Sequence, residues 1–327
     1  MSQASRPALL VTRKLPDPVE QRLEADFDTT LNLDDHPRSA DEIIAASQGK
    51  QAILCTVGDP FSAQLINRLP DSIRILATFS AGYNHIDVGA AQARGMAVTN
   101  TPDVLTDATA DIAMLLMLGA ARRASEGERL VRRRAWTGWA PTHMMGFHLG
   151  GKRLAIVGLG RIGEAVARRA QAFGMEVHYA NRSGRRSPTL PNAVLHPDLD
   201  SLLPVADVLS LHAPSTPDTR LWLNRERIQR LPVGAIVVNT ARGDLVDDEA
   251  LIEALRSGQV AAAGLDVFDG EPAMNPGYLA LENTFLLPHL GSATRETRVA
   301  MGMRAADNLD AFFFGQPPRD LLPPTGV

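Results

Sequence analysis

The sequence predicts an α/β protein with two doubly wound parallel sheets, and three observations support this prediction. Short apolar runs alternate with segments of helical periodicity along most of the chain. The segments between the runs are long enough for the crossover helices that parallel strands require. The chain has 327 residues, which is enough for two domains of ordinary size.

The predicted strands form two series separated by a glycine-rich turn near the middle of the chain. The first series comprises residues 9–11, 53–55, 75–77 and 98–99, and the second comprises 154–157, 177–180, 208–211, 235–238, 264–267 and 284–287. Two long helices are also predicted. One begins near Thr106, a residue type that caps helices, and the other covers about residues 294–314.

These two helices carry the chain between two predicted domains. The first domain comprises residues 1–101 together with 290–327, and the second comprises residues 102–289. Thr101-Pro102 marks the first boundary, because the residue before a proline disfavours helix. Proline pairs at 317–318 and 323–324 predict an irregular end to the first domain.

The glycine-rich turn carries the strongest functional signal in the sequence. Gly158, Gly160 and Gly163 follow the run 154–157 at GxGxxG spacing, and an amphipathic segment comes next. Gly158 lets the chain turn off the strand, Gly160 leaves room for a pyrophosphate, and Gly163 lets the helix pack closely on the sheet. The helix start offers unpaired N–H groups to the phosphates. The sequence therefore predicts a dinucleotide site, and a glycine turn without a ligand is the alternative.

Composition argues against several other classes of protein. The formal net charge is −4, which does not indicate binding to nucleic acid or to an anionic membrane. Cys55 is the single cysteine, so no disulfide within the chain is expected and a buried, inert thiol is favoured. The apolar runs are too short for a signal peptide or a membrane span, and a cytoplasmic protein is expected. The scattered histidines predict no metal site.

Three polar residues follow predicted strands of the second domain, at the sheet edge where ligands bind in open α/β sheets. Arg242 follows 235–238, Glu271 follows 264–267 and His289 follows 284–287. Reduction of a ketone by hydride transfer needs a proton donor and a fixed positive charge, which histidine and arginine supply. A carboxylate such as Glu271 would orient the imidazole and favour its charged form. The alternative is a surface ion pair between Arg242 and Glu271, with His289 capping a turn.

The chain resembles the D-isomer-specific 2-hydroxyacid dehydrogenases over most of its length. The motifs that carry the resemblance are residues 81–87, the glycine turn, 239–243, 264–272 and 288–294. The resemblance implies a Rossmann-like and a flavodoxin-like domain with the active site in the cleft between them. It also implies roles for individual residues. Arg242 would hold the substrate, His289 would be the acid and base, and Glu271 would pair with His289.

Further contacts are expected from the same resemblance. The N–H groups of Ala81 and Gly82 would receive the substrate carboxylate, and Asp266 would bind the nicotinamide carboxamide. Other cofactor contacts are expected at the remaining turn residues and at strand ends, namely Leu159, Arg161, Ile162, Ala213, Pro214, Thr240, Ala241 and Gly291.

Two stretches, 100–110 and 136–141, look most like glyoxylate and hydroxypyruvate reductases. In those enzymes the loop at the position of Trp139 reaches the active site of the neighbouring subunit, which implies a homodimer and a substrate contact at Trp139. Simple packing of an interface loop is the alternative. Asn84 departs from the aspartate that many relatives carry, and an effect on loop hydrogen bonding is expected there.

The residues after the strand 177–180 indicate the cofactor. A site specific for NAD places an acidic residue there, whereas this chain has Asn181, Arg182 and Ser183, which can donate hydrogen bonds to a 2′-phosphate. NADPH is therefore the predicted cofactor, and NADH stays possible. The predicted activity is NADPH-dependent reduction of glyoxylate or hydroxypyruvate to glycolate or D-glycerate. The alternatives are a broad 2-keto acid or 2-ketogluconate reductase and, from another class, a nucleotide-sensing corepressor.

Overall fold

The computed structural model describes residues 6–181, 184 and 186–324. The chain forms two compact units, which we call the split unit (Met1–Leu105 with Ala293–Val327) and the central unit (Thr106–Ser292). Both boundaries lie a few residues after the predicted positions. Val104 and Leu105 pack on the core of the split unit, and the N–H groups of Leu290 and Gly291 donate to Asp266 of the central unit.

The split unit contains a sheet of parallel strands in the order β2-β1-β3-β4-β5, a doubly wound arrangement of the flavodoxin type. Its strands are β1 (Ala8–Val11), β2 (Asp28–Thr30), β3 (Ala52–Cys55), β4 (Ile75–Thr78) and β5 (Ala97–Thr99). Its helices are α1 (Asp17–Asp26), α2 (Ala40–Ala46), α3 (Ala63–Arg68), α4 (Val88–Ala93) and α10 (Arg295–Phe313).

Alternate side chains of these strands enter two apolar layers, because successive residues of a strand face opposite sides of the sheet. Leu9 and Val11 lie in the layer beneath α1 and α10, whereas Leu10 faces the layer beneath α2, α3 and α4. Ser39, Asp87 and Thr294 accept hydrogen bonds from backbone N–H groups and so begin α2, α4 and α10.

The central unit contains a second parallel sheet, in the order β12-β11-β10-β9-β6-β7-β8. Counted from β6, this is the 3-2-1-4-5-6-7 order of a Rossmann fold. Its strands are β6 (Arg153–Val157), β7 (Glu176–Ala180), β8 (Val194–Leu195), β9 (Val208–Leu211), β10 (Ala235–Asn239), β11 (Val260–Leu265) and β12 (Thr284–Leu286). Its helices are α5 (Thr106–Ala121), α6 (Ala124–Arg132), α7 (Arg161–Ala172), α8 (Arg225–Gln229) and α9 (Asp248–Ser257), with the 3₁₀ turns η1 (Asp200–Val205), η2 (Gly243–Leu245) and η3 (Pro276–Ala280).

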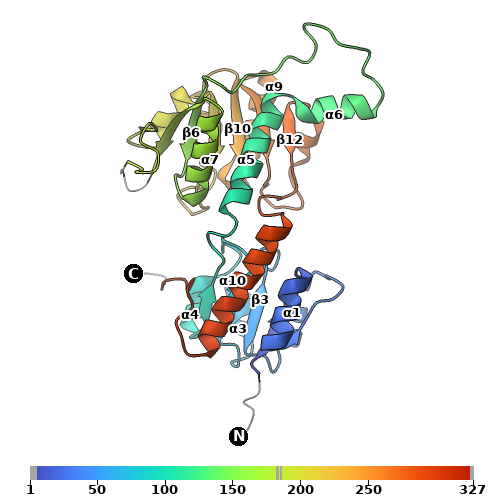
Figure 1. Cartoon of the computed structure of the whole chain (residues 1–327), viewed down its shortest axis with the longest axis vertical. Coiled ribbons are helices and arrows are strands. Elements are labelled where there is room, and N and C mark those ends of the chain that lie inside the picture. Colours follow the sequence, from blue (N-terminus) through green and yellow to red (C-terminus); the bar gives the residue numbers. More distant parts are fainter. Residues whose placement is uncertain (1–5, 182–183, 185, 325–327) are drawn as a thin grey trace. The chain divides into compact units, whose positions relative to one another are not determined.

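Helices cover both faces of this sheet. Figure 1 shows α5 and α7 side by side on one face, and α9 packs against β11 from the other. Gly119 of α5 and Gly264 of β11 allow a close approach on the first face. A Cβ at Gly119 would lie 2.4 Å from the Phe285 ring, and one at Gly264 would lie 2.7 Å from the Leu116 carbonyl oxygen. Most of the strands predicted from the sequence are confirmed in the two sheets.

The strands that the sequence did not predict are short. β2 carries Asp28 and two threonines, and β8 has two residues, so neither offers a continuous apolar run. The predicted strand 264–267 begins earlier, at Val260, and this start was missed because three of the six residues of β11 are alanines, which do not form a strongly apolar run. It ends at Leu265, where the backbone turns to place Asp266.

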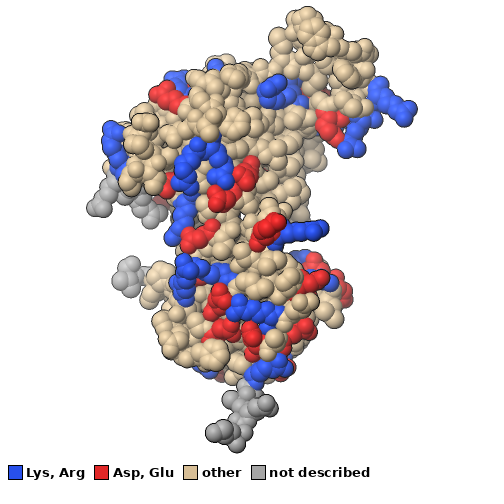
Figure 2. Space-filling model, viewed as in Figure 1, with Lys and Arg blue, Asp and Glu red and all other residues tan. Residues whose placement is uncertain are grey.

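Across the described ranges, no helix is long and apolar enough to span a membrane. On the face drawn in Figure 2, basic and acidic side chains are intermingled. Arg22 of α1, for example, pairs with Asp26, Asp307 and Asp310.

Candidate active site

Arg242, Glu271 and His289 follow three adjacent strands of the central unit. Arg242 comes after β10, Glu271 lies in the loop after β11, and His289 comes after β12. Since parallel strands end at the same edge, the three side chains are gathered at the carboxyl edge of one sheet. Glu271 and His289 are in contact, with Oε1 of the carboxylate 2.5 Å from Nδ1 of the imidazole.

Asp266 fixes the backbone on which His289 sits. The His289 N–H donates to the Asp266 carbonyl oxygen at 2.9 Å, and φ of His289 is +56°, a left-handed conformation. The Asp266 carboxylate accepts the N–H groups of Leu290 at 2.6 Å and Gly291 at 2.8 Å. These bonds hold a strained residue in one conformation, which is common at functional sites.

Asp266 itself is 1% exposed. Burial raises the pKa of Asp266, while the two N–H donors and the charge of His289 act against that rise. Both carboxylate oxygens already accept a hydrogen bond, although an oxygen has capacity for a second. The contact with a nicotinamide carboxamide that we predicted for Asp266 stays a prediction.

Glu271 is held at both oxygens. Its second oxygen, Oε2, accepts the Phe268 N–H at 3.2 Å. Burial alone would raise the pKa of Glu271, but the hydrogen bond and charge of His289, the Phe268 N–H and the charge of Arg242 together lower it below its ordinary value. Glu271 therefore stays a carboxylate at neutral pH and accepts the Nδ1–H of His289.

The turn that presents Arg242 is built by Asn239, which is 1% exposed. The Asn239 side chain accepts the Ala241 N–H at 2.9 Å and donates to the Arg242 carbonyl oxygen at 2.8 Å. Arg242 also donates from Nη1 to the Ala241 carbonyl oxygen at 2.6 Å. Burial lowers the pKa of Arg242, and the Glu271 and Asp244 carboxylates oppose that shift.

Gly243 brings this turn against the loop of Glu271. A Cβ at Gly243 would lie 1.9 Å from the backbone carbon of Phe268, so a side chain there would separate the two loops.

His289, Glu271 and Arg242 together supply an oriented imidazole, a carboxylate and a guanidinium at one sheet edge. These groups can bind an anionic carbonyl compound and protonate its oxygen.

The glycine turn has the geometry that a pyrophosphate requires. Gly158 has φ +94°, and a Cβ there would lie 2.7 Å from the Ala213 nitrogen. A Cβ at Gly163 would lie 2.5 Å from the Gly158 carbonyl oxygen, which explains the close packing of α7. A Cβ at Gly160 would meet nothing within 4 Å, so packing within the chain does not require glycine there. The open space above Gly160, at the start of α7, fits a phosphate group.

The other predicted cofactor residues lie at the same edge. Leu159, Arg161 and Ile162 form the turn and first residues of α7, Asn181 follows β7, Ala213 and Pro214 follow β9, Thr240 and Ala241 follow β10, and Gly291 lies beside Asp266. Arg182 and Ser183 lie outside the described residues.

The sequence analysis did not single out His212. Its Nε2 lies 2.8 Å from the Ser210 hydroxyl, and its Nδ1 lies 3.4 Å from the Thr240 hydroxyl. Burial lowers the pKa of His212 to about 4, so this side chain is neutral.

Ala81 and Gly82 belong to the split unit, in the loop after β4. Trp139 lies in the central unit, in the segment between α6 and β6, and is 82% exposed. The same segment carries the exposed side chains of Trp136, Met145 and Phe147.

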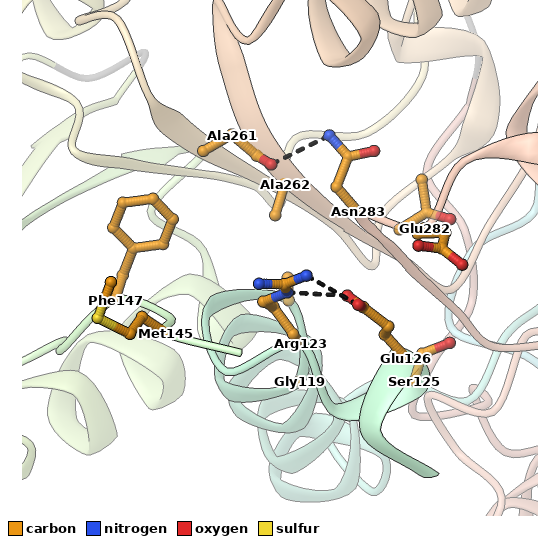
Figure 3. A pocket seen from close by; sticks show the side chains of 12 residues that line it. Gly119, Arg123, Ser125, Glu126, Met145, Phe147, Ala261, Ala262, Glu282 and Asn283 are labelled. Atoms are coloured by element: carbon orange, nitrogen blue, oxygen red, sulfur yellow. Dashed lines mark hydrogen bonds and ion pairs between the residues drawn. The ribbon is translucent and has the colours of Figure 1, made fainter. Parts of the chain in front are cut away.

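A cavity of about 370 Å³ opens beside this segment and is drawn in Figure 3. Met145 and Phe147 line it together with the end of α5, the start of α6 and the first residues of β11 and β12. Arg123 and Glu126 point toward one another within it and form an ion pair at 2.7 Å. The cavity lies at the amino-terminal ends of the strands, so it is separate from Arg242 and His289.

Comparisons with known proteins identify the family of this chain. The model of the family described as "D-isomer specific 2-hydroxyacid dehydrogenase, NAD binding domain" matches residues 114–291. A glycerate dehydrogenase of Hyphomicrobium methylovorum is 46% identical over 95% of this chain and 97% of that protein. A glyoxylate reductase of Korarchaeum cryptofilum is 41% identical over 97% of this chain and 96% of that protein.

Solved structures agree as well. The NADPH-dependent glyoxylate/hydroxypyruvate reductase of Sinorhizobium meliloti, in complex with NADP and malonate, has a TM-score of 0.88 and 35% identity, with 97% of each chain covered. Fold and site thus define an oxidoreductase that uses a nicotinamide cofactor. The chain belongs to the D-isomer-specific 2-hydroxyacid dehydrogenase family.

Proposed function

We propose that this protein reduces glyoxylate or hydroxypyruvate to glycolate or D-glycerate, with NADPH as the preferred cofactor. The observation that carries the proposal is the contact between His289 Nδ1 and Glu271 Oε1 at 2.5 Å, at the sheet edge that also presents Arg242. The names of the relatives support the substrate class, since they include glyoxylate reductases and a glycerate dehydrogenase.

The start of α7 would hold the cofactor. Its first N–H groups and the space above Gly160 suit the pyrophosphate, and no side chain of the described residues caps this helix end. When bound, the reduced nicotinamide supplies a hydride to the carbonyl carbon of the keto acid. The remaining steps belong to side chains of the protein.

His289 is the proton donor of the proposed reaction. Its Nδ1–H donates to Glu271, so the proton on Nε2 is the one that can be transferred. As the carbonyl carbon receives the hydride, the electron pair of the C=O bond moves onto the oxygen, which takes the Nε2 proton. The hydroxy acid forms, and His289 is left neutral with its Nδ1–H still bonded to Glu271.

Arg242 and the loop of Ala81 and Gly82 would bind the substrate. The guanidinium is a planar donor that suits a carboxylate and the neighbouring carbonyl oxygen. It also stabilises the negative charge that develops on that oxygen. The Ala81 and Gly82 N–H groups would receive the carboxylate.

Selectivity for NADPH is proposed to come from Asn181, Arg182 and Ser183. Charge-assisted hydrogen bonds contribute roughly 1.5–3 kcal/mol, so one arginine contact to a 2′-phosphate could give a tenfold to hundredfold preference. The relative from Sinorhizobium meliloti is described as NADPH-dependent.

One assay tests substrate and cofactor together. The purified protein is given NADPH or NADH with glyoxylate, hydroxypyruvate or 2-ketogluconate, and loss of absorbance by the reduced cofactor is followed. We expect the highest kcat/KM with NADPH and one of the two smaller acids. Equal or better efficiency with NADH would refute the cofactor preference, and a preference for 2-ketogluconate would favour the broader reductase. No oxidation of NADPH with any keto acid would favour a corepressor.

Arg182→Ala should lower kcat/KM with NADPH at least tenfold and leave NADH unaffected, because only NADPH carries the 2′-phosphate. Arg186→Ala is the matched control, since Arg186 is an exposed arginine a few residues along the same loop. A similar loss in both variants would point to a general charge effect.

We also propose a homodimer in which Trp139 contacts the active site of the neighbouring subunit. The exposure of Trp136, Trp139, Met145 and Phe147 on one segment supports this, because such clusters mark protein–protein contacts. Light scattering should give twice the chain mass. A fully active monomer would refute the proposal, and Trp139→Ala should raise the KM for the keto acid in a protein that stays dimeric.

A further inference from the structure

A chain of hydrogen bonds runs under the loop that contains Ala81 and Gly82. The Thr78 hydroxyl lies 2.9 Å from His85 Nε2 and 2.8 Å from the Ser80 hydroxyl, and the Ser80 hydroxyl donates to the Gly82 carbonyl oxygen at 2.6 Å. Thr78 is 0% exposed and Ser80 is 5% exposed. Water therefore has little access to replace these bonds.

The number of protons that each group can donate sets a single direction for this series of hydrogen bonds. The Gly82 carbonyl oxygen can only accept, so the one hydroxyl proton of Ser80 is committed to it. Ser80 must then accept from Thr78, whose own proton is thereby used. Thr78 in turn must accept from His85, so His85 carries a proton on Nε2. The order is His85 Nε2–H to Thr78, Thr78 to Ser80, and Ser80 to the Gly82 carbonyl.

Two more donors hold the same loop. The Thr101 N–H donates to the Ser80 carbonyl oxygen at 2.8 Å, and the Asn100 side chain donates to the Ala81 carbonyl oxygen at 2.7 Å. The carbonyls of Ser80, Ala81 and Gly82 are therefore all bound by groups of the split unit.

Bound carbonyls fix the direction of the neighbouring N–H groups. In a planar trans peptide the N–H of the next residue points opposite to the carbonyl. Binding of the Ser80 and Ala81 carbonyls thus turns the N–H groups of Ala81 and Gly82 away from the donors that hold the loop. Across the described parts of the chain, neither N–H has an acceptor.

We propose that Ser80 is a positioning residue. Together with Thr78, His85 and Asn100, it holds the loop of Ala81 and Gly82 in the orientation that binds the substrate carboxylate. This inference rests on the proposed function. Ser80 acts through the backbone and does not itself touch the substrate. The Ser80 hydroxyl holds the far side of Gly82, because it binds the Gly82 carbonyl, while Asn100 binds the Ala81 carbonyl on the near side. Without that hydroxyl, the peptide after Gly82 can rotate, Gly82 is held on one side only, and its N–H is no longer ordered in advance.

Ser80→Ala is the first test. We expect the KM for glyoxylate and the inhibition constant of oxalate, a carboxylate that cannot be reduced, to rise together by roughly tenfold, the usual effect of losing one well-placed hydrogen bond. The KM for NADPH should stay within about twofold, because Ser80 belongs to the substrate loop and not to the cofactor turn.

Ser47→Ala is the matched control. Ser47 is a fully buried serine of the same unit, and its hydroxyl donates to the Ile44 carbonyl oxygen at 2.8 Å, far from the loop in sequence. It should lose a similar amount of thermal stability and keep its KM for glyoxylate. Equal changes in KM in the two variants, or an unchanged oxalate constant in Ser80→Ala, would overturn the proposal.

A second pair of variants keeps the test decisive if Ser80→Ala folds poorly. Thr78→Val retains the shape of the side chain but removes the hydroxyl, whereas Thr78→Ser retains the hydroxyl. We expect Thr78→Val to raise both constants and Thr78→Ser to restore them, and failure of the serine to rescue binding would overturn the proposal. A wild-type protein that reduces no keto acid refutes the proposed function instead, so the two failures are distinguishable.

Discussion

The carboxylate of Glu271 contacts His289 through one oxygen, at 2.5 Å from Nδ1, and the Phe268 N–H through the other, at 3.2 Å. The backbone of His289 is held at the same time by its hydrogen bond to the Asp266 carbonyl. Ring and backbone are therefore fixed independently. This double restraint leaves the Nε2 edge of the imidazole as the part that can exchange a proton with a substrate.

His289→Gln should reduce kcat by at least about a hundredfold, which is the usual contribution of a general acid. Glutamine keeps a polar side chain of similar length but has no transferable proton near neutral pH. Binding of NADPH, followed by the change in its fluorescence, should be nearly unaltered because His289 lies outside the glycine turn. Normal turnover in this variant would show that another group donates the proton.

Glu271→Gln should change the pH profile of reduction. The pKa of Glu271 lies below its ordinary value, so in the wild type it is ionised at neutral pH and loses its charge only as the pH falls through that lowered pKa. The wild-type kcat should therefore decline in acid, as Glu271 is protonated and no longer holds the Nδ1–H of His289. The amide has no charge to lose, so the variant should have a lower kcat at neutral pH and should lack this acid decline. The profile is measured at constant ionic strength.

Glu282→Gln serves as the control for this change, because Glu282 lines the cavity at the opposite edge of the sheet. Its profile should match that of the wild type. Loss of the acid decline in both variants would mean that net charge, and not the pairing of Glu271 with His289, causes that decline.

Sequence reasoning found the three catalytic candidates because two simple rules apply to them. Arg242, Glu271 and His289 each follow an apolar run that forms a strand, and parallel strands end at one edge of a sheet. Gly158 and Gly163 were found because their spacing reflects steric needs that the structure shows. At Gly160 packing within the chain does not require glycine, and the proposed reason for glycine there is the space for a phosphate.

Other features could not be predicted, because they depend on contacts between distant parts of the chain. The sequence gives no sign that the Asp266 carboxylate accepts the N–H groups of Leu290 and Gly291, residues that lie far along the chain. The chain from His85 through Thr78 to Ser80 likewise depends on how the loop after β4 folds back. The short strand β8 has too few residues to form a pattern.

Gly160 and Gly163 of the turn are expected to contribute differently to the stability of the protein and to the binding of NADPH. Gly160→Ala should fold with nearly wild-type stability, since the added Cβ meets nothing within 4 Å and φ is −92°. It should nevertheless weaken NADPH binding at least tenfold, because the methyl group occupies the space proposed for the pyrophosphate.

Gly163→Ala is the contrasting variant. Its Cβ would lie 2.5 Å from the Gly158 carbonyl oxygen, so α7 must shift and the protein should lose stability by about 1–3 kcal/mol. Thermal unfolding and a fluorescence titration with NADPH separate the two effects. Unchanged NADPH affinity in a well-folded Gly160→Ala variant would mean that the phosphates bind elsewhere.

The ion pair between Arg304 and Asp320 joins α10 to the C-terminal segment and predicts a dependence of stability on pH. The two side chains form two hydrogen bonds, at 2.5 Å and 2.8 Å, and Asn308 donates to the same carboxylate at 3.0 Å. Burial would raise the pKa of Asp320, but these hydrogen bonds hold it below its ordinary value. A carboxyl group whose pKa is lower in the folded than in the unfolded protein stabilises the fold above the unfolded pKa.

Asp320→Asn should therefore lower the free energy of unfolding at pH 7 by about 2–4 kcal/mol, because it leaves the largely buried Arg304 without its charged partner. The difference from the wild type should shrink as the pH falls through the lowered pKa of Asp320, where the wild-type carboxylate also becomes neutral. Urea unfolding at neutral and acidic pH measures both effects. Asp41→Asn is the control, since Asp41 and Arg68 are both exposed and pair at 2.6 Å, and an exposed pair adds little stability. Equal losses in the two variants at pH 7, or a gap that does not narrow in acid, would show that the Arg304–Asp320 pair does not hold the C-terminal segment.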